Sequence, residues 1–154
     1  MKLSEDKHFV KWSAFSMQGW RKTQEDYHLV KYDEDKQVSL FGVFDGHGGR
    51  QVSEFLKDNF WEELTSNANY RGRKYELALK ETFVRMDAKL IEDQNRREQA
   101  LKDALLDAKY WEKRKLPVPK KREDMKEQEK KTEKWYWNIK DVGSTCSVVL
   151  VTRD

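Results

Sequence analysis

The chain has 154 residues, about the size of one domain, and 38% of them are charged, but the net charge of +3 is too small to indicate nucleic-acid binding by itself. Its single cysteine, Cys146, excludes an internal disulfide, and the sequence has neither a signal-peptide pattern at its amino end nor the run of about 18 apolar residues that a membrane span needs. We therefore expect a cytoplasmic or nuclear protein with no membrane association, whose 19 aromatic residues supply apolar area for a core.

The first part of the chain has the patterns of β-strands. Apolar and polar residues roughly alternate in FVKWSAFSM (Phe9–Met17), and more loosely in YHLVKY (Tyr27–Tyr32). The polar stretch DEDKQ separates Tyr27–Tyr32 from the nearly continuous apolar run Val38–Phe44, so these two segments predict a hairpin. A continuous apolar run also predicts a strand that is covered on both faces.

Two amphipathic helices are predicted next. Apolar residues recur at helical spacing in QVSEFLKDNFWEEL and again in KYELALKETFVRMDAKLIED. The first stripe consists of Val52, Phe55, Leu56, Phe60 and Leu64, and the second of Tyr75, Leu79, Phe83, Met86 and Leu90. Both stripes are predicted to pack against a sheet of antiparallel strands, which gives an α+β fold.

The chain changes character at Gln94. Residues 94–140 contain 15 lysines and arginines against 9 acidic residues, and the prolines of LPVP end any helix that continues past Gln94. The stretch KKREDMKEQEKKTEK has one clearly apolar side chain, Met125, and cannot bury enough surface to form a core. We predict that 94–140 is a charged, partly helical insertion between a first part, 1–93, and a final strand segment, 141–154.

This insertion has two interpretations. It is either a solvated surface excursion or a docking arm for an acidic protein partner. The aromatic stretch WYW (Trp135–Trp137) beside the lysines suits stacking on a partner or on nucleic acid, but it also suits an anchor that returns the chain to the core. We prefer the anchor, so a nucleic-acid partner is not expected.

Three short stretches carry side chains suited to chemistry: SMQGWRKTQEDYH (16–28), FDGHGG (44–49) and GSTCSVVLV (143–151). A carboxylate such as Asp45 at the end of an apolar strand is costly to bury without a cation or several donors. Its flanking glycines allow close approach of the backbone to a ligand, and carboxylate oxygens suit a hard divalent metal ion. Glu25 and Asp26 add oxygens, although strand alternation points them to opposite faces, and the planar guanidinium of Arg21 suits a phosphate.

The same residues also fit a plain structural explanation. DG is a common turn dipeptide, GHGG is compatible with a loop before a helix, and a Glu-Asp pair or a single arginine usually lies at the surface. A zinc site on His28 and His47 is not supported, because no Cys/His ligand spacing accompanies them. Cys146 fits a small buried strand residue.

In this order, the three stretches resemble the opening motifs of the type 2C family (PPM family) of metal-dependent serine/threonine protein phosphatases. MQGWR with EDYH is similar to the first motif of that family, FDGHGG to its signature, and GSTCSVVLV to its Gly-Ser-Thr strand. The resemblance covers about residues 10–93 and 142–154. It implies a partial α-β-β-α sandwich that is incomplete at the carboxyl end.

The resemblance implies a site for two Mg²⁺ or Mn²⁺ ions. Asp45 would bridge both ions, while the backbone carbonyl of Gly46 and the carboxylate of Glu25 would complete the ligands of one. Asp26 would hold water that is bound to metal. Water activated in this way would attack phosphorus in line, with no phosphoenzyme.

The implied function is a protein serine/threonine phosphatase acting on phosphoproteins. Arg21 would bind the substrate phosphate, and His47 would be the general acid that protonates the departing seryl or threonyl oxygen. The alternative is a catalytically incomplete phosphatase-like module with a structural or interaction role in a larger assembly. It follows from two departures: the later metal-binding aspartates of the family have no counterpart after GSTCSVVLV, and segment 94–140 is longer than the family's connection. The chain is then expected to be a fragment, a half-enzyme completed by another polypeptide, or a derived protein without catalysis.

Overall fold

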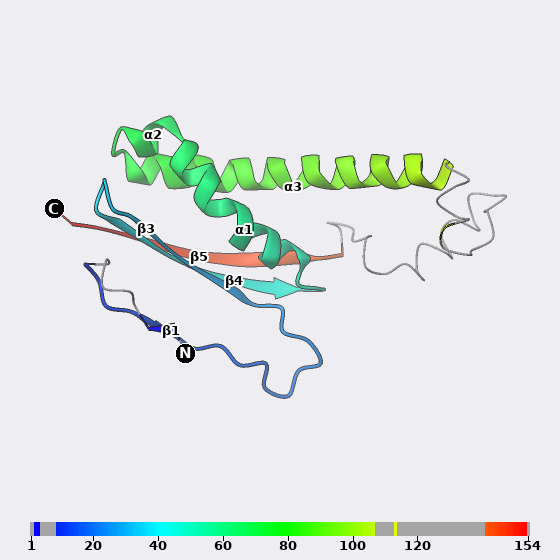
Figure 1. Ribbon diagram of the computed structural model, residues 1–154, viewed down its shortest axis with the longest axis horizontal. Coiled ribbons are helices and arrows are strands. Elements are labelled where there is room, and N and C mark those ends of the chain that lie inside the picture. Colours follow the sequence, from blue (N-terminus) through cyan, green and yellow to red (C-terminus); the bar gives the residue numbers. More distant parts are fainter. Residues whose placement is uncertain (1, 4–8, 107–112, 114–140, 154) are drawn as a thin grey trace.

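The predicted hairpin forms the centre of the fold, in a computed structural model that describes residues 2–3, 9–106, 113 and 141–153 (Figure 1). Strands β3 (Tyr27–Asp33) and β4 (Val38–His47) pair antiparallel, from Tyr27 opposite Phe44 to Asp33 opposite Val38. Strand β5 (Gly143–Thr152) pairs antiparallel with the other edge of β4, so β4 is central in the order β3-β4-β5. The predicted α+β class with an antiparallel sheet is confirmed.

The turn between β3 and β4 is held by the side chain of Asp33. Its Oδ1 accepts a hydrogen bond from the backbone amide of Lys36 at 3.0 Å, and Gln37 takes a left-handed φ of 55° that closes the turn. Oδ2 of the same carboxylate accepts a hydrogen bond from the hydroxyl of Tyr70 at 3.0 Å. The turn is thereby attached to the short helix α2 (Ala68–Arg71).

Helices α1 (Gln51–Ser66) and α3 (Tyr75–Leu106) lie with α2 on one face of the sheet (Figure 1). The rings of Phe44 on β4 and Phe60 on α1 are 5.9 Å apart, and Phe60 meets Phe83 of α3 edge-on at 5.3 Å. The buried apolar residues of this core are Leu29, Val38, Leu40, Phe44, Val52, Leu56, Phe60, Leu64, Tyr70, Ala78 and Met86. The predicted stripe of α1 is confirmed as the face that packs on the sheet. The predicted stripe of α3 is only partly buried: Met86 is buried, whereas Phe83 is 36% exposed, and the other fully buried positions are Ala78 and Thr82.

The prediction of a strand over Phe9–Met17 is largely wrong. Only β2 (Ser13–Ala14) is a strand there, and it pairs with β1 (Lys2–Leu3) instead of joining the main sheet. Two aromatic rings of the segment pack on the main sheet: Phe9 lies 6.2 Å from Tyr32, and Trp12 lies edge-on to Phe41 at 6.5 Å. Phe15 and Met17, which continue the alternation, are exposed, so only the first half of the pattern marks side chains that face the sheet.

The prediction that β4 is covered on both faces also needs correction. Along β4 the even-numbered residues face the helices and are buried, whereas Val43, Asp45 and His47 face the other side and are exposed. Val43 is 54% exposed and Val149 on β5 is 58% exposed. In the part of the chain that the structure describes, the segment before β3 covers this second face only in part (Figure 1).

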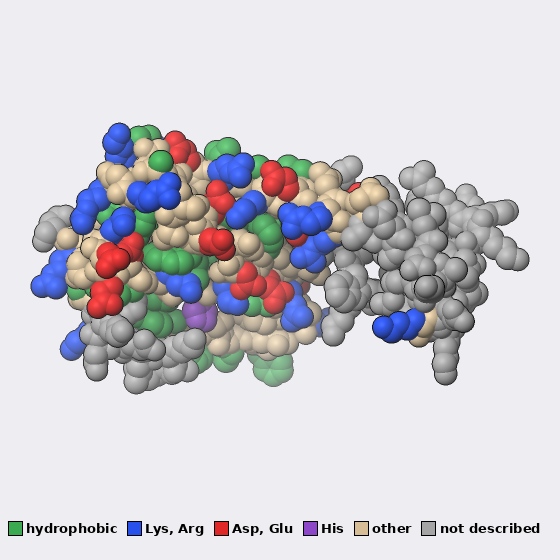
Figure 2. Space-filling model, turned by 45° about the horizontal axis from the view of Figure 1, so that its top comes forward, with side chains coloured by type: hydrophobic (Ala, Val, Ile, Leu, Met, Phe, Trp, Pro, Cys, Tyr) green, Lys and Arg blue, Asp and Glu red, His purple; other side chains and the backbone are tan. Residues whose placement is uncertain are grey.

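Helix α3 continues without a break across Gln94 to Leu106. The proposed division of the chain at 93/94 thus falls inside a helix, and it remains a prediction. The LPVP, KKREDMKEQEKKTEK and WYW stretches lie outside the described residues. None of the described helices is long and apolar enough to cross a membrane. Over the helical face, acidic and basic side chains are interspersed (Figure 2).

Candidate metal and phosphate site

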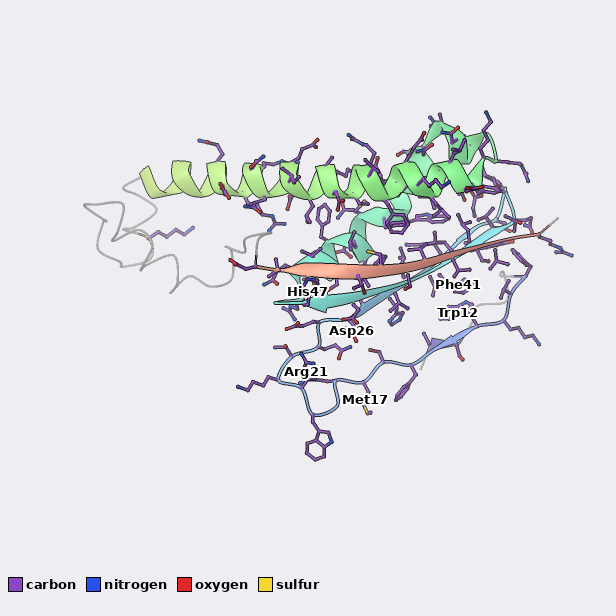
Figure 3. The ribbon with its side chains drawn as sticks, turned by 180° about the vertical axis from the view of Figure 1, so that it is seen from behind. Trp12, Met17, Arg21, Asp26, Phe41 and His47 are labelled. Carbon is purple, nitrogen blue, oxygen red and sulfur yellow. The ribbon has the colours of Figure 1, made fainter. Side chains whose placement is uncertain are left out.

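Two carboxylates meet where β3 begins and β4 ends. The register of the hairpin pairs Tyr27 with Phe44, and continuing it by one residue sets Asp26 opposite Asp45. Successive residues of a strand point to opposite faces, so both carboxylates lie on the face away from the helices. Figure 3 shows Asp26, Arg21 and His47 toward the same end of the sheet, and Trp12 and Phe41 toward the other. The register of the β3-β4 hairpin therefore brings the carboxylates of Asp26 and Asp45 together.

The electrostatics of Asp26 reflect this crowding. Desolvation raises the pKa of the Asp26 carboxyl above its ordinary value, and the charge of Asp45 together with a hydrogen bond to its carboxyl raises the pKa further. Arg21 acts in the opposite direction and lowers it, while Glu25 adds a smaller increase. Desolvation is the largest cause of the rise, and the neighbouring carboxyl of Asp45 comes second, so the ionised form of Asp26 is disfavoured at this point.

Glu25 takes a different position from its neighbour. Its carboxylate accepts a hydrogen bond from the Thr23 hydroxyl at 2.8 Å, and its backbone carbonyl accepts one from the hydroxyl of Ser53 on α1. The expectation that Glu25 and Asp26 face opposite ways agrees with this arrangement. Of the two, it is Asp26 that contacts Asp45.

Arg21 is presented by a closed loop before β3. The amide of Arg21 donates to the carbonyl of Gln18 at 3.4 Å, and the Gln18 side chain donates back to the Arg21 carbonyl at 2.7 Å. Gly19, inside this turn, has a φ of 60°, a left-handed value that glycine adopts without steric cost. The side chain of Gln24 bonds to the hydroxyl of Ser16 at 2.9 Å and joins the two limbs of the loop. The guanidinium is exposed and lies close enough to act on Asp26.

His47 is the last residue of β4 and pairs with Gly143, the first residue of β5. A Cβ at position 143 would lie 2.5 Å from Nε2 and 2.7 Å from Cε1 of the imidazole, so the ring rests directly on the glycine backbone. Glycine in the GSTCSVVLV stretch is what leaves room for this ring. His47 is exposed on the same face as Asp45, two residues away along the strand.

The glycines after His47 allow the chain to pass close to the segment that leads into β5. Gly48 has a φ of 71°, and a Cβ there would overlap the carbonyl of Asp141. Gly46 is buried and pairs with Ser144 of β5. The spacing of glycines in FDGHGG is thus explained by close backbone packing as well as by the suggested ligand.

The donor set fits a divalent cation in part. Asp26 and Asp45 would supply hard carboxylate oxygens to such an ion, and Gly46 would add the neighbouring backbone carbonyl of the predicted ligand set. Among the residues that the structure describes, no three His, Cys, Asp or Glu side chains gather closely enough to hold a metal ion. The arrangement therefore has the character of one side of a metal site.

An open cleft of about 610 Å³ adjoins the carboxylates. It lies between the segment before β3 and the uncovered face of the sheet, and Asp26 and His28 line it together with apolar side chains such as Met17, Val43 and Val149. Met17, Val43 and Val149 are exposed in the described part of the chain, so this face of the sheet carries uncovered apolar surface.

Sequence reasoning missed one residue that organises the site, Ser53. The signal was present in the helix pattern, because Ser53 precedes Leu56, Phe60 and Leu64 at helical spacing and is a polar residue on an apolar face. Its partner, the backbone carbonyl of Glu25, carries no sequence signal.

Comparison with known proteins identifies the family of the chain. A family model described as Protein phosphatase 2C matches residues 10–105, which is more than half of the chain. This match defines a phosphatase-type domain, with which the α+β fold is consistent, and the chain belongs to the protein phosphatase 2C family. Members of this family are metal-dependent protein phosphatases. The matched range ends before Gly143–Thr152, so that strand is assigned to the domain by its pairing with β4.

Individual relatives show the same likeness. The chain is 49% identical over 89 residues to "Probable protein phosphatase 2C 2" of Paramecium tetraurelia, an alignment that covers 58% of this chain and 30% of the relative. It is 48% identical over 89 residues to "Protein phosphatase 2C 1" of the same organism, with the same coverage. It is 42% identical over 88 residues to "Probable protein phosphatase 2C 21" of Arabidopsis thaliana, covering 56% of this chain and 25% of the relative. The matched part thus spans about 30% or less of the length of these curated relatives.

Proposed function

We propose that the protein is a metal-dependent protein serine/threonine phosphatase, and that Asp45 is its central metal ligand. The observation that carries this proposal is the contact between the Asp26 and Asp45 carboxyls beside Arg21, in a chain of the phosphatase 2C family. Asp45 and Asp26, with the Gly46 carbonyl and Glu25, would hold Mg²⁺ or Mn²⁺, two ions in the complete site. When bound, such ions supply Lewis-acid chemistry, making water a better nucleophile at neutral pH and offsetting charge on the phosphate.

The residues of this chain have separate tasks in the proposed reaction. Arg21 stands exposed on its braced loop and binds the phosphate of a phosphoserine or phosphothreonine through its planar guanidinium. His47, held against Gly143 on the same face as Asp45, donates a proton to the serine or threonine oxygen as the bond to phosphorus breaks. The phosphoprotein substrate approaches from the uncovered face of the sheet.

A second candidate function is a phosphatase-like module with an interaction role. The observation that favours it is that only two carboxylates meet among the described residues, which leaves a metal with few protein ligands. The basic excess of residues 94–140 would then bind an acidic protein partner. For either function we place the protein in the cytoplasm or nucleus, because its single cysteine suits a reducing compartment.

Metal binding tests the site itself. Titration of the 154-residue chain with Mn²⁺, followed by the electron paramagnetic resonance signal of free Mn²⁺, is expected to show saturable binding that Asp45→Ala abolishes. Asp35→Ala is the matched control, because Asp35 is an exposed aspartate in the turn at the opposite end of the hairpin. Equal Mn²⁺ binding by all three proteins would reject the proposed site.

Activity separates the two candidate functions. Mn²⁺-dependent release of phosphate from a phosphoserine peptide, lost in Asp45→Ala and kept in Asp35→Ala, would reject the interaction module. A folded chain that binds Mn²⁺ at Asp45 and releases no phosphate would reject the claim that these residues suffice for catalysis. His47→Ala is expected to slow hydrolysis of the phosphoserine peptide by about 10²–10⁴-fold. Hydrolysis of an aryl phosphate is expected to slow less, because a phenolate leaves without needing a proton.

A further inference from the structure

Ser53 connects the first turn of α1 to the loop before β3. Its side chain is fully buried, with 0% of its surface exposed, although serine is a residue type that mostly lies at protein surfaces. The hydroxyl lies at 2.9 Å from the carbonyl oxygen of Arg50 and in closer contact with the carbonyl oxygen of Glu25, which is 28 residues away in sequence.

The contact with Arg50 is a local feature of helices, but the contact with Glu25 is not. A helical serine commonly bonds to the carbonyl three or four residues before it, and Ser53 does so with Arg50. Helix geometry accounts for the contact with Arg50, whereas the Glu25 carbonyl is a second acceptor that the fold brings to the hydroxyl from another element.

Gly46 forms the other side of the slot that holds the Glu25 carbonyl. A Cβ at Gly46 would overlap that carbonyl oxygen and would lie 2.7 Å from the Ser53 hydroxyl. The carbonyl is thus held between the backbone of β4 and the side chain of Ser53. Three elements meet at this point: the loop before β3, the end of β4 and the start of α1.

The residues next to this slot are the paired acids. Asp26 follows Glu25 in the chain, and Asp45 precedes Gly46, so fixing Glu25 against Gly46 also fixes the backbones that carry the two carboxylates. We propose that Ser53 is a positioning residue for the metal site, which sets the separation of Asp26 and Asp45 by holding the Glu25 carbonyl. Its role toward metal rests on the proposed function, whereas its role in placing the backbone does not.

The variant Ser53→Ala removes the hydroxyl and adds no bulk. Ser66→Ala is the matched control, because Ser66 is also on α1 and donates to a backbone carbonyl, that of Glu63 at 2.9 Å, but is exposed and far from the acids. Ser53 contacts the backbone of Glu25 and not a proposed ligand atom, so it acts by orienting the residues that carry the ligands. Loss of a group that orients metal ligands typically weakens metal affinity by about 10–100-fold. We expect the Mn²⁺ dissociation constant of Ser53→Ala to rise by that factor and that of Ser66→Ala to be unchanged.

A metal-free readout keeps the inference separate from the proposed function. In amide NMR spectra, Ser53→Ala is expected to shift the resonances of the Asp26 and Gly46 amides and to speed their hydrogen exchange. Ser66→Ala is expected to change neither the resonances nor the exchange rates. Unchanged Asp26 and Gly46 amides, or Mn²⁺ binding by Ser53→Ala equal to the unsubstituted chain, would overturn the inference. If the unsubstituted chain binds no Mn²⁺, the proposed metal site fails, and the amides alone decide whether Ser53 positions the backbone.

The unsubstituted chain supplies a further check that does not depend on the variant folding. Because the Ser53 hydroxyl lies beside the Gly46 backbone, nuclear Overhauser contacts are expected between the Ser53 β-protons and the Gly46 α-protons. Their absence in a folded chain would also overturn the inference.

Discussion

Replacing Gly46 with alanine is the sharpest steric perturbation of the site. The φ of Gly46 does not lie in the left-handed region, so alanine meets no backbone penalty there. The added methyl would overlap the Glu25 carbonyl and lie 2.7 Å from the Ser53 hydroxyl, well inside an ordinary van der Waals contact. Neither atom can swing aside easily, since one is main chain and the other belongs to a fully buried side chain.

The size of the effect follows from two terms. Overpacking of a buried position typically costs about 1–3 kcal/mol. Displacing Glu25 from Ser53 also removes a hydrogen bond, which contributes about 1 kcal/mol. We therefore expect the free energy of unfolding to fall by about 2–4 kcal/mol, which for a chain of this length corresponds to a decrease in Tm of roughly 6–15 °C.

Thermal unfolding followed by circular dichroism measures this change, with Gly72→Ala as the control. Gly72 ends α2 with a φ of −83°, and a Cβ there would lie 3.4 Å from its nearest neighbour, the Ala68 carbonyl. We expect Gly72→Ala to change stability by about 0.5 kcal/mol or less, because ordinary contact adds no strain. If Gly46→Ala melts at the same temperature as Gly72→Ala, the slot between Gly46, Glu25 and Ser53 is not closed as described.

Three further predictions concern charge, a buried hydrogen bond and the thiol. Desolvation and, second to it, the neighbouring Asp45 raise the pKa of Asp26, so its ionised form is disfavoured in the folded state. Asp26→Asn should therefore raise Tm at pH 7, and the gain should vanish at pH 3, below the ordinary value of 3.8; an equal gain at both pH values would refute this. Tyr70→Phe removes the 3.0 Å hydrogen bond to Asp33 and should lower the free energy of unfolding by about 1–3 kcal/mol. Urea titration measures this change, and an unchanged unfolding midpoint would contradict the prediction. Burial raises the pKa of Cys146 to about 11, so at pH 7.5 iodoacetamide should modify the folded chain far more slowly than the urea-unfolded chain, and equal rates would be inconsistent with a half-buried thiol.

The sequence predicted the hairpin and both main helices because each has a local signature. The hairpin is a polar DEDKQ turn between apolar runs, and α1 shows its buried face as a stripe of period 3.6. The strand predicted over Phe9–Met17 failed because alternation alone cannot distinguish a strand from an irregular segment whose rings pack on a sheet. The coverage of β4 was overestimated for a related reason. An apolar run indicates that its side chains favour burial, but Val43 remains exposed in the described part of the chain.

The site divides in the same way. The presence of Asp26, Asp45, Arg21 and His47 in short motifs, and the family they indicate, came from the amino-acid order alone, because those side chains are recognisable one by one. Only the tertiary structure decided which of them meet. The antiparallel register sets Asp26 opposite Asp45 and turns the Glu25 carboxylate to Thr23.

The supports of the site belong wholly to the tertiary structure. Gly143 is read from sequence as part of a strand, and only folding places the imidazole of His47 on its backbone. Ser53 reads as a minor polar residue on a helix, and only folding brings the Glu25 carbonyl to it from 28 residues away. The physical reason is that a side chain carries its chemistry with it, whereas a backbone carbonyl is the same at every residue and acquires a role only from what is folded against it.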